Sequence, residues 1–304
     1  MARPGGARVR SPDARDTGGI VIAQPSSSAG SLQLGFVGLG RMGGPIASNL
    51  AKSGLPLSVY DILPDAVEAL EALGASPAAS PADVARDADI IGICVVNDAQ
   101  TFDVVSGTDG LLSTARPGST IILHSSIHPD TCREVARLGA AQGVDVLDVP
   151  VSGHNAKAVN GELTLMIGGD GDVVARCEPY LSVIGENRYH LGPIGSGAIA
   201  KLSNNVMAIL AKLATYEGLN VARASGIDVD TMVDISLVST GQSESLRQWR
   251  VQGLQHGPTP GLLEGVGLNG EKDLRHALAV ARERGEDLPV VAAVLDLMEA
   301  IRAS

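Results

Sequence analysis

The fold is decided by residues 32–61, LQLGFVGLGRMGGPIASNLAKSGLPLSVYD, in a chain of 304 residues. Residues 32–37 have the apolar character of a short buried strand, and residues 45–52 form a helical pattern that ends at Gly54. LSVY then makes a second strand, which ends at Asp61. The stretch therefore predicts a strand–turn–helix–strand unit whose two strands are parallel.

The turn between the first strand and the helix is rich in glycine. Gly38, Gly40 and Gly43 fit the pattern G-x-G-x-x-G. After a strand and before a helix, such glycines let backbone amides approach a pyrophosphate at the helix N-terminus. A glycine-rich turn without a ligand is the alternative. The residues that we expect at a dinucleotide here are Gly38, Leu39, Gly40, Arg41, Met42 and Gly43.

Asp61 lies at the end of the second strand, about 20 residues after the glycines. A carboxylate at this position accepts hydrogen bonds from a ribose diol and repels a 2′-phosphate. The next residues are Ile62, Leu63 and Pro64, so no arginine follows that could hold such a phosphate. The pattern favours NAD over NADP as the cofactor. The alternative is that Asp61 only caps the next helix.

The α/β pattern continues to about residue 193. We expect further strands at residues 87–96, 119–126, 144–153 and 162–169, separated by helices. This alternation predicts a largely parallel, doubly wound Rossmann-type sheet, which binds ligands at the carboxyl ends of its strands. Polar residues expected at those ends are Asn97, Ser125, Ser126, Ser152 and Asn155.

The rest of the chain predicts helices only. One long helix runs from about residue 198 to 224 and stops at Ser225-Gly226, and no strand pattern returns after it. The fold class is therefore α/β: a dinucleotide-binding Rossmann domain at residues 32–193, followed by an all-helical domain at residues 194–304. Residues 1–31 are rich in Gly, Ser, Arg and Pro, and we expect a disordered tail; the alternative is that they lie upstream of the true start of the protein.

Composition excludes several classes of function. The 23 basic and 34 acidic residues give a net charge of −11, and aromatic residues make up only 2%, so we expect no nucleic acid partner. No apolar run approaches the roughly 20 residues of a membrane span. Cys94, Cys132 and Cys177 are far apart in the sequence, as expected of free thiols in a reducing cytoplasm.

The stretch GSGAIAKLSNN, residues 195–205, places a lysine at the start of the long helix. Lys201 and Asn205 are one helical turn apart and share a face. Burying an ammonium without a partner is costly, so Lys201 either reaches solvent along the helix surface or transfers a proton in a closed cleft.

Four stretches between residues 36 and 274 form a set by their order and spacing: FVGLGRMGGPIASNL, DVPVSGHNAKAVNGELTLMIGG, GSGAIAKLSNN and EKDL. They resemble the motifs of the β-hydroxyacid dehydrogenase family, although Ile46 stands where that family usually has Met, and the resemblance covers essentially residues 33–304. The resemblance implies a Rossmann domain followed by a helical domain. It also implies reversible oxidation of a small 3-hydroxy acid to a semialdehyde or keto acid, by hydride transfer to a nicotinamide.

The resemblance also assigns roles to matching positions. Lys201 matches the family's general acid/base, and Asn205 matches the asparagine that holds substrate and lysine in place. Ser152 and Gly153 match the segment that binds the substrate carboxylate, next to His154. Ser126 matches a Ser/Thr near the nicotinamide and the substrate, and Lys272 matches a lysine at the mouth of the cofactor and substrate sites. Val96 and Asn97, at the end of the strand expected at residues 87–96, are further expected cofactor contacts. For Lys272, an ordinary exposed helix lysine is the alternative.

Two histidines depart from the family pattern. His154 replaces the second glycine of S-G-G, which leaves the identity of the substrate open, and His124 stands where the family often has Asp. His154 either reaches into the substrate cleft or points to solvent. A metal site at His124 and His128 is disfavoured because Pro129 interrupts a helical pair, so we expect no metal.

Cys94 is expected to be a core residue within a strand, and Trp249 a packing anchor in the helical domain or at a subunit interface. A homo-oligomer, a dimer or a tetramer, is expected. The alternatives to the dehydrogenase are an imine reductase, which typically lacks the lysine at position 201, and a catalytically silent NAD-binding module.

Overall fold

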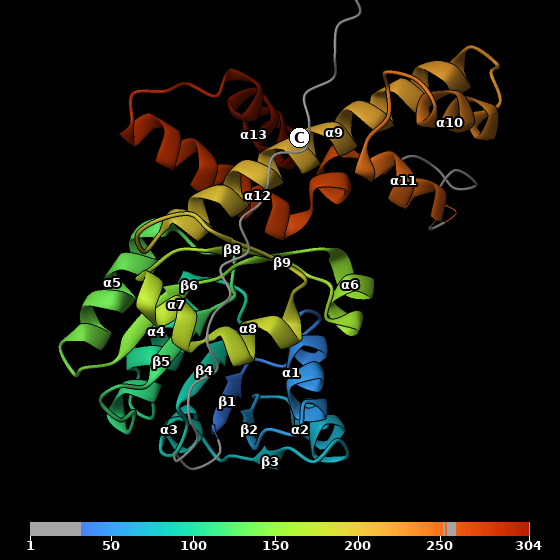
Figure 1. Cartoon of the computed structure of the whole chain (residues 1–304). Helices are drawn as coiled ribbons and strands as arrows, with labels where there is room; N and C mark the ends of the chain where they lie inside the picture. Colours follow the sequence, from blue (N-terminus) through green and yellow to red (C-terminus); the bar gives the residue numbers. More distant parts are fainter. Residues whose placement is uncertain (1–31, 252, 254–259, 304) are drawn as a thin grey trace, which may run out of the picture. The chain divides into compact units, whose positions relative to one another are not determined.

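A computed structural model of the chain describes residues 32–251, 253 and 260–303, so the tail expected at residues 1–31 lies outside the described residues. The first part contains six parallel strands in the order β3-β2-β1-β4-β5-β6 (Figure 1). Because crossovers run in both directions from β1, this is the doubly wound arrangement that the sequence predicts. The strands are β1 (Leu34–Val37), β2 (Leu57–Tyr60), β3 (Ser76–Pro77), β4 (Ile90–Ile93), β5 (Thr120–Leu123) and β6 (Asp145–Asp148).

Helices cover both faces of this sheet, so its central strands are buried throughout, as is usual for parallel sheets. Neighbouring residues of β1 face opposite ways. Phe36 belongs to a core with α1 and α8, whereas Val37 belongs to a core with α3 and α5. The helices of this part are α1 (Gly43–Lys52), α2 (Pro64–Glu71), α3 (Pro81–Ala85), α4 (Asp98–Ser106), α5 (Pro129–Ala140), α6 (His154–Asn160), α7 (Gly171–Arg176) and α8 (Glu178–Ile184), with a 3-10 turn at Leu111–Ser113.

The strand expected at residues 144–153 is wrong as a single element. Residues Asp145–Asp148 end the six-stranded sheet as β6, and β7 (Val151–Ser152) begins a second sheet of order β7-β8-β9. Pro150 separates the two because it has no N–H to donate to a strand ladder. The strand predicted at 162–169 therefore lies outside the main sheet, as β8 (Thr164–Ile167), antiparallel to β7 and parallel to β9 (Asn187–His190).

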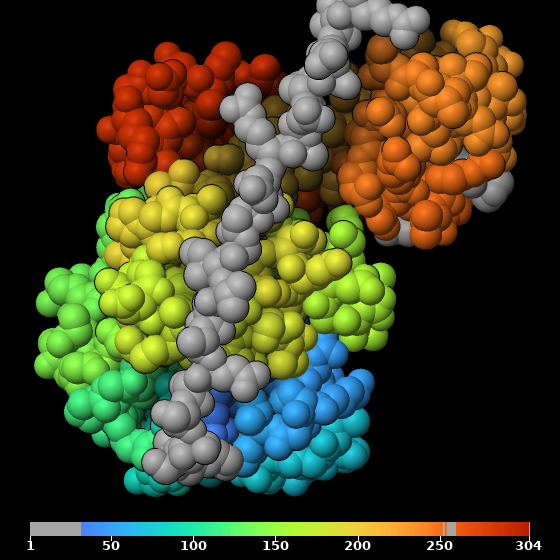
Figure 2. Space-filling view, in the orientation of Figure 1, coloured from blue at the N-terminus to red at the C-terminus, as the bar shows by residue number. Residues whose placement is uncertain are grey.

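The second part is helical, and no strand follows β9 among the described residues. Helix α9 (Ser196–Ala224) has 29 residues, starts two residues before the predicted position and ends as predicted, before Gly226 with φ +76°. Two helix pairs pack on it and form the separate orange and red groups of Figure 2. They are α10 (Val229–Leu237) with α11 (Glu244–Val251), and α12 (Leu262–Glu283) with α13 (Pro289–Ala303).

Two further expectations concern the helical part. Trp249 is 2% exposed and packs edge-on against Tyr216, with ring centroids 4.7 Å apart, which confirms a packing anchor inside this part. None of the described helices combines the length and the apolarity needed to cross a bilayer. The domain boundary between residues 193 and 194 stays a prediction.

A buried carboxylate fixes the start of α9 against the sheet. Asp148, at the end of β6, is 1% exposed and accepts hydrogen bonds from the backbone N–H groups of Gly195 and Ala198, both at 2.7 Å. Burial raises its pKa to about 6, against the effect of these amide bonds. Asp148 thus positions the first turn of the helix that carries Lys201.

Candidate active site

The glycine-rich loop shows which of its glycines the protein itself requires. Gly38 has φ +91°, and a Cβ there would lie 2.5 Å from the carbonyl oxygen of Cys94. A Cβ on Gly43 would lie 1.9 Å from the carbonyl oxygen of Gly38. A Cβ on Gly40 would meet no protein atom within 4 Å. The protein therefore requires glycine at two positions, whereas at Gly40 the open space fits the close approach of a ligand.

The N-terminus of α1 is suited to an anion. Its N-cap, Met42, makes no side-chain hydrogen bond, and the first turn holds no acidic residue. The helix dipole and the N–H groups of the glycine loop that precedes α1 therefore fit the pyrophosphate of a dinucleotide. The side chains of Leu39 and Met42 pack into the core, so that only their backbone can face a cofactor, whereas Arg41 is exposed.

Asp61 joins the glycine loop to the start of α2. Its Oδ2 accepts a hydrogen bond from the N–H of Leu39 at 2.6 Å, and its Oδ1 accepts one from Leu63 at 2.9 Å. It is not the N-cap of α2, which is Leu63. Each carboxylate oxygen keeps a lone pair for a ribose hydroxyl. Gly38, Gly40 and Asp61 line one pocket of about 350 Å³, whose residues fit the ribose and pyrophosphate of a dinucleotide.

The far wall of this pocket comes from the end of β4. Val96 lines it and is 58% exposed. Asn97 does not line it, and its Oδ1 caps α4 by accepting the N–H of Gln100 at 2.9 Å. Cys94 lies just beyond β4 rather than inside the predicted strand, and burial raises the pKa of its thiol to about 12. A thiol with that pKa is not a nucleophile at neutral pH.

Lys201 lies near a charged pair from α12. The amide Nδ2 of Asn205 donates to Asp273 Oδ2 at 2.6 Å, and Asp273 Oδ1 lies 3.1 Å from the ammonium of Lys272. The same ammonium donates to the carbonyl oxygen of Ser126, beyond β5. The structure thus brings Asn205, Ser126 and Lys272 together, and Lys272 is not a free surface lysine.

The pKa of Lys201 is lowered, chiefly because burial disfavours the charged ammonium. The negative charge of Asp273 opposes this shift, and the positive charge of Lys272 adds to it. A lysine with a lowered pKa can act as a base towards an alcohol and as an acid towards a carbonyl.

The segment after β7 has a backbone that only small residues adopt easily. Ser152 is half-buried, Gly153 has φ +147°, and a Cβ there would lie 2.9 Å from the Cβ of Lys157. His154 has φ +58°, the only positive φ among the described residues other than glycine. Its side chain is exposed and lines a pocket that also contains Asn204 of α9. His154 therefore occupies a glycine-like position and faces α9 rather than open solvent alone. Asn155 is exposed on α6.

His124 and Ser125 have structural roles. His124 is buried and has a pKa lowered to about 4 by desolvation, so it is neutral. Its Nδ1 therefore donates to the carbonyl of Val149 at 2.9 Å, and its Nε2 accepts from the hydroxyl of Tyr180 at 2.8 Å. Both ring nitrogens are thus engaged in the core. Ser125 is buried and accepts from the N–H of Val95.

One group of potential metal ligands lies near His128. Single ligand atoms of His128, Asp130 and Glu283 fall within 4.8 Å of one another, but the Asp130 carboxylate is exposed and already pairs with Arg133.

Two residues of the site escape sequence reasoning. Asp273 follows Lys272 in EKDL, and it is 6% exposed. The sequence signal that could have indicated Asp273 as a site residue is a carboxylate directly beside a lysine on an otherwise amphipathic helix. Asp148 begins the DVPVSG motif, but its contact to the amides of α9 depends on the tertiary fold.

Two family models match the chain. Residues 33–192 match the NAD binding domain of 6-phosphogluconate dehydrogenase, and residues 195–304 match the NAD-binding model of NADP-dependent 3-hydroxyisobutyrate dehydrogenase.

Individual proteins agree with these matches. The chain is 35% identical to the mitochondrial 3-hydroxyisobutyrate dehydrogenase of Rattus norvegicus over 83% of this chain and 73% of that one. It is 33% identical to the 2-(hydroxymethyl)glutarate dehydrogenase of Eubacterium barkeri over 90% of each. The crystal structure of a 3-hydroxyisobutyrate dehydrogenase from Salmonella typhimurium superposes with a TM-score of 0.78 at 30% identity, over 90% of this chain and 95% of that one. The chain therefore belongs to the β-hydroxyacid dehydrogenase family of nicotinamide-dependent oxidoreductases.

Proposed function

We propose that the protein oxidises a small 3-hydroxy acid reversibly to a semialdehyde or keto acid, with NAD as the preferred cofactor and Lys201 as the general acid/base. The observation that carries the proposal is the environment of Lys201. Its ammonium is desolvated on the first turns of α9, and Asn205, Asp273 and Lys272 surround this end of the helix.

In the oxidation direction, neutral Lys201 takes the hydroxyl proton of the substrate while the hydride leaves its carbon. The nicotinamide, when bound, supplies the hydride acceptor. In the reverse direction the Lys201 ammonium returns the proton to the developing alkoxide. A lowered pKa serves both directions, because the group must change protonation state in each turnover.

The other residues of the site orient and tune Lys201. Asn205 is held by Asp273, and this fixes its amide one turn from Lys201 so that it can bond the substrate. Asp273 and Lys272 act on the proton affinity of Lys201 in opposite senses. Lys272 also joins α12 to the carbonyl oxygen of Ser126 beyond β5, at the carboxyl edge of the sheet where a dinucleotide is expected to bind.

Binding of the substrate carboxylate is assigned to Ser152 and Gly153, whose small size lets backbone N–H groups approach an anion. NAD is preferred over NADP because Asp61 would face a 2′-phosphate, and the exposed Ile62 and Leu63 offer it no cation. Backbone N–H groups of the glycine loop would hold the pyrophosphate. Domains at residues 32–193 and 194–304, a homo-oligomer and a cytoplasmic location are part of the same proposal.

The test is a panel of 3-hydroxy acids assayed by NADH absorbance, with NAD and NADP run in parallel. Turnover of at least one small 3-hydroxy acid, with a higher kcat/KM for NAD, is expected. Cyclic imines with NADPH test the imine reductase alternative, which Lys201 itself disfavours. If NAD binds but no acid and no imine is turned over, the catalytically silent module is the better description.

A further inference from the structure

A second, larger pocket lies farther along α9 than the proposed reaction centre. It has a volume of about 580 Å³, within the range of small-molecule sites. Its lining includes His154 of α6, Asn204 and Lys212 of α9, and Gln248 and Trp249 of α11. The amide of Asn204 donates to Asn205 Oδ1 at 3.3 Å, so this pocket begins beside the residues around Lys201.

Lys212 is the unexplained charge of this pocket. It is half-buried, and burial alone lowers the pKa of its ammonium. No hydrogen bond or ion pair joins Lys212 to any other residue within the described ranges. The one carboxylate in the lining, Glu244, accepts instead from Gln248 at 2.9 Å. A half-buried cation without a counter-charge costs free energy unless a ligand supplies the charge.

The indole N–H of Trp249 is a second group in this pocket that a ligand could satisfy. The indole N–H of Trp249 is buried and has no acceptor among the described residues, although this residue lines the pocket. Buried N–H groups are nearly always paired, so this one is a candidate for a ligand or a water. His154 adds an imidazole to the lining of the same pocket.

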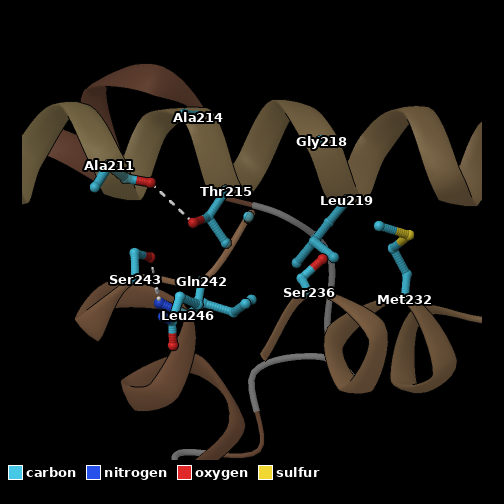
Figure 3. A pocket seen from close by; sticks show the side chains of 11 residues that line it. Ala211, Ala214, Thr215, Gly218, Leu219, Met232, Ser236, Gln242, Ser243 and Leu246 are labelled. Atoms are coloured by element: carbon cyan, nitrogen blue, oxygen red, sulfur yellow. Dashed lines mark hydrogen bonds between the residues drawn. The ribbon is translucent and has the colours of Figure 1, made fainter. Parts of the chain in front are cut away.

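The neighbouring pocket of the helical part makes a useful contrast. Figure 3 shows this pocket, of about 410 Å³, between α9, α10 and α11. None of the described residues that line it has a titratable side chain. The hydroxyl of Thr215 donates to the carbonyl of Ala211, and the hydroxyl of Ser243 accepts from the N–H of Leu246. Uncompensated charge is therefore not a general property of this region.

From these observations we infer that Lys212, with Trp249 and His154, forms a distal subsite for a second anionic group of the substrate, a terminal carboxylate or phosphate. The inference rests on the proposed function, which places the reacting carbon at Lys201. The substrate class is then a 3-hydroxy acid with an extended side chain that ends in an oxyanion.

The spacing along α9 sets the length of that side chain. Asn205, which we propose bonds the substrate, and Lys212 are seven residues apart, which is about 10 Å at 1.5 Å per residue. An extended chain covers about 3.5 Å per three bonds, as in a polypeptide. The long side chain of Lys212 leans towards the helix N-terminus and so shortens the distance to its ammonium. A substrate side chain of about eight to ten bonds therefore reaches the Lys212 ammonium.

The experiment uses 3-hydroxypropionates with a substituent of nine bonds at C2 that ends in methyl, carboxylate or phosphate, together with 3-hydroxyisobutyrate. Steady-state kinetics with NAD are measured for the unmodified chain and for Lys212→Met, Lys212→Arg and Lys52→Met. Lys52 is an exposed lysine at the end of α1 and serves as the matched control.

The unmodified chain should have a KM about tenfold or more lower for an oxyanion-terminated acid than for the methyl-terminated acid, as expected for a charged hydrogen bond. Lys212→Met should remove this difference without changing the KM for 3-hydroxyisobutyrate, and Lys212→Arg and Lys52→Met should keep it. Whichever terminal group, carboxylate or phosphate, lowers the KM more relative to the methyl-terminated acid is the one that the subsite prefers.

An equal KM for charged and uncharged side chains, or a preference that survives in Lys212→Met, overturns the inference. If no acid is oxidised, the proposed function fails, and calorimetric binding of the same compounds then decides on the subsite. Binding of the charged compound that is tenfold tighter and depends on Lys212 supports it, and equal binding refutes it.

Discussion

Replacing Gly40 with alanine separates the needs of the fold from those of the cofactor. A Cβ at this position meets no protein atom within 4 Å, and Gly40 is not among the glycines with positive φ. Gly40→Ala should therefore leave the free energy of unfolding unchanged, or raise it by up to about 1 kcal/mol by restricting the unfolded chain. The added methyl group instead occupies the space in which we expect the pyrophosphate.

The expected cost to NAD binding follows from that contact. Forcing a methyl group into a tightly packed contact costs about 1–3 kcal/mol, which corresponds to a Kd raised about 5- to 150-fold. Titration of NAD by calorimetry gives the Kd, and thermal unfolding without NAD gives the stability.

Gly43→Ala is the matched comparison. Its Cβ would lie 1.9 Å from a backbone oxygen, so this variant should lose stability even without NAD. An NAD affinity of Gly40→Ala equal to that of the parent protein would refute the placement of the pyrophosphate at this loop.

Three further predictions concern the charges and the backbone of the site. Asp273→Asn removes a charge that raises the pKa of Lys201, so the acid limb of the pH profile of kcat/KM for oxidation should move to lower pH. Lys272→Met removes a charge that lowers this pKa, so the acid limb should move to higher pH. Shifts of both variants in the same direction would contradict this electrostatic account. Asp61→Ala should reduce the preference for NAD in a comparison of kcat/KM for the two cofactors, and an unchanged ratio would remove Asp61 from cofactor selection. His154→Gly should unfold at an equal or higher temperature, because relief of the left-handed backbone, about 1–2 kcal/mol, exceeds the cost of the added chain entropy of glycine, about 0.5–1 kcal/mol. The same variant should change the order of kcat/KM values among polar and apolar hydroxy acids. An unchanged order would leave His154 without a role in specificity.

Much of this architecture is predictable from the sequence because each of these elements has a recognisable local pattern of residues. The glycines after β1, Asp61 after β2 and the long apolar helix that starts near Lys201 all follow rules of spacing. The second sheet was missed because β9 (Asn187–His190) is exposed at every residue and therefore carries no apolar signal. The break at Pro150 was visible in the sequence, but DVLDVPV is apolar on both sides of it.

The parts of the site that sequence reasoning did not find depend on contacts between distant residues. The carboxylate of Asp273 meets Asn205 across 68 positions, and Asp148 reaches the amides of α9 across about 50. No periodicity reports such contacts. The subsite proposed at Lys212 rests on the lack of a bonding partner among the described residues, which only the packed structure reveals. Asn97 was expected from the sequence to contact the cofactor, but in the structure its Oδ1 caps α4, and this hydrogen bond competes with a cofactor contact.

The central claim is that Lys201 transfers the proton, and the most direct measurement is the kcat of Lys201→Ala with NAD and the best 3-hydroxy acid of the panel. Because general acid–base groups contribute about 10²–10⁴-fold, kcat should fall by that factor while the Kd for NAD stays within a few-fold of the parent value. Added primary amines should restore part of the rate in proportion to their concentration. A kcat within a few-fold of the parent enzyme, or a loss that follows weaker NAD binding alone, would contradict the role of Lys201.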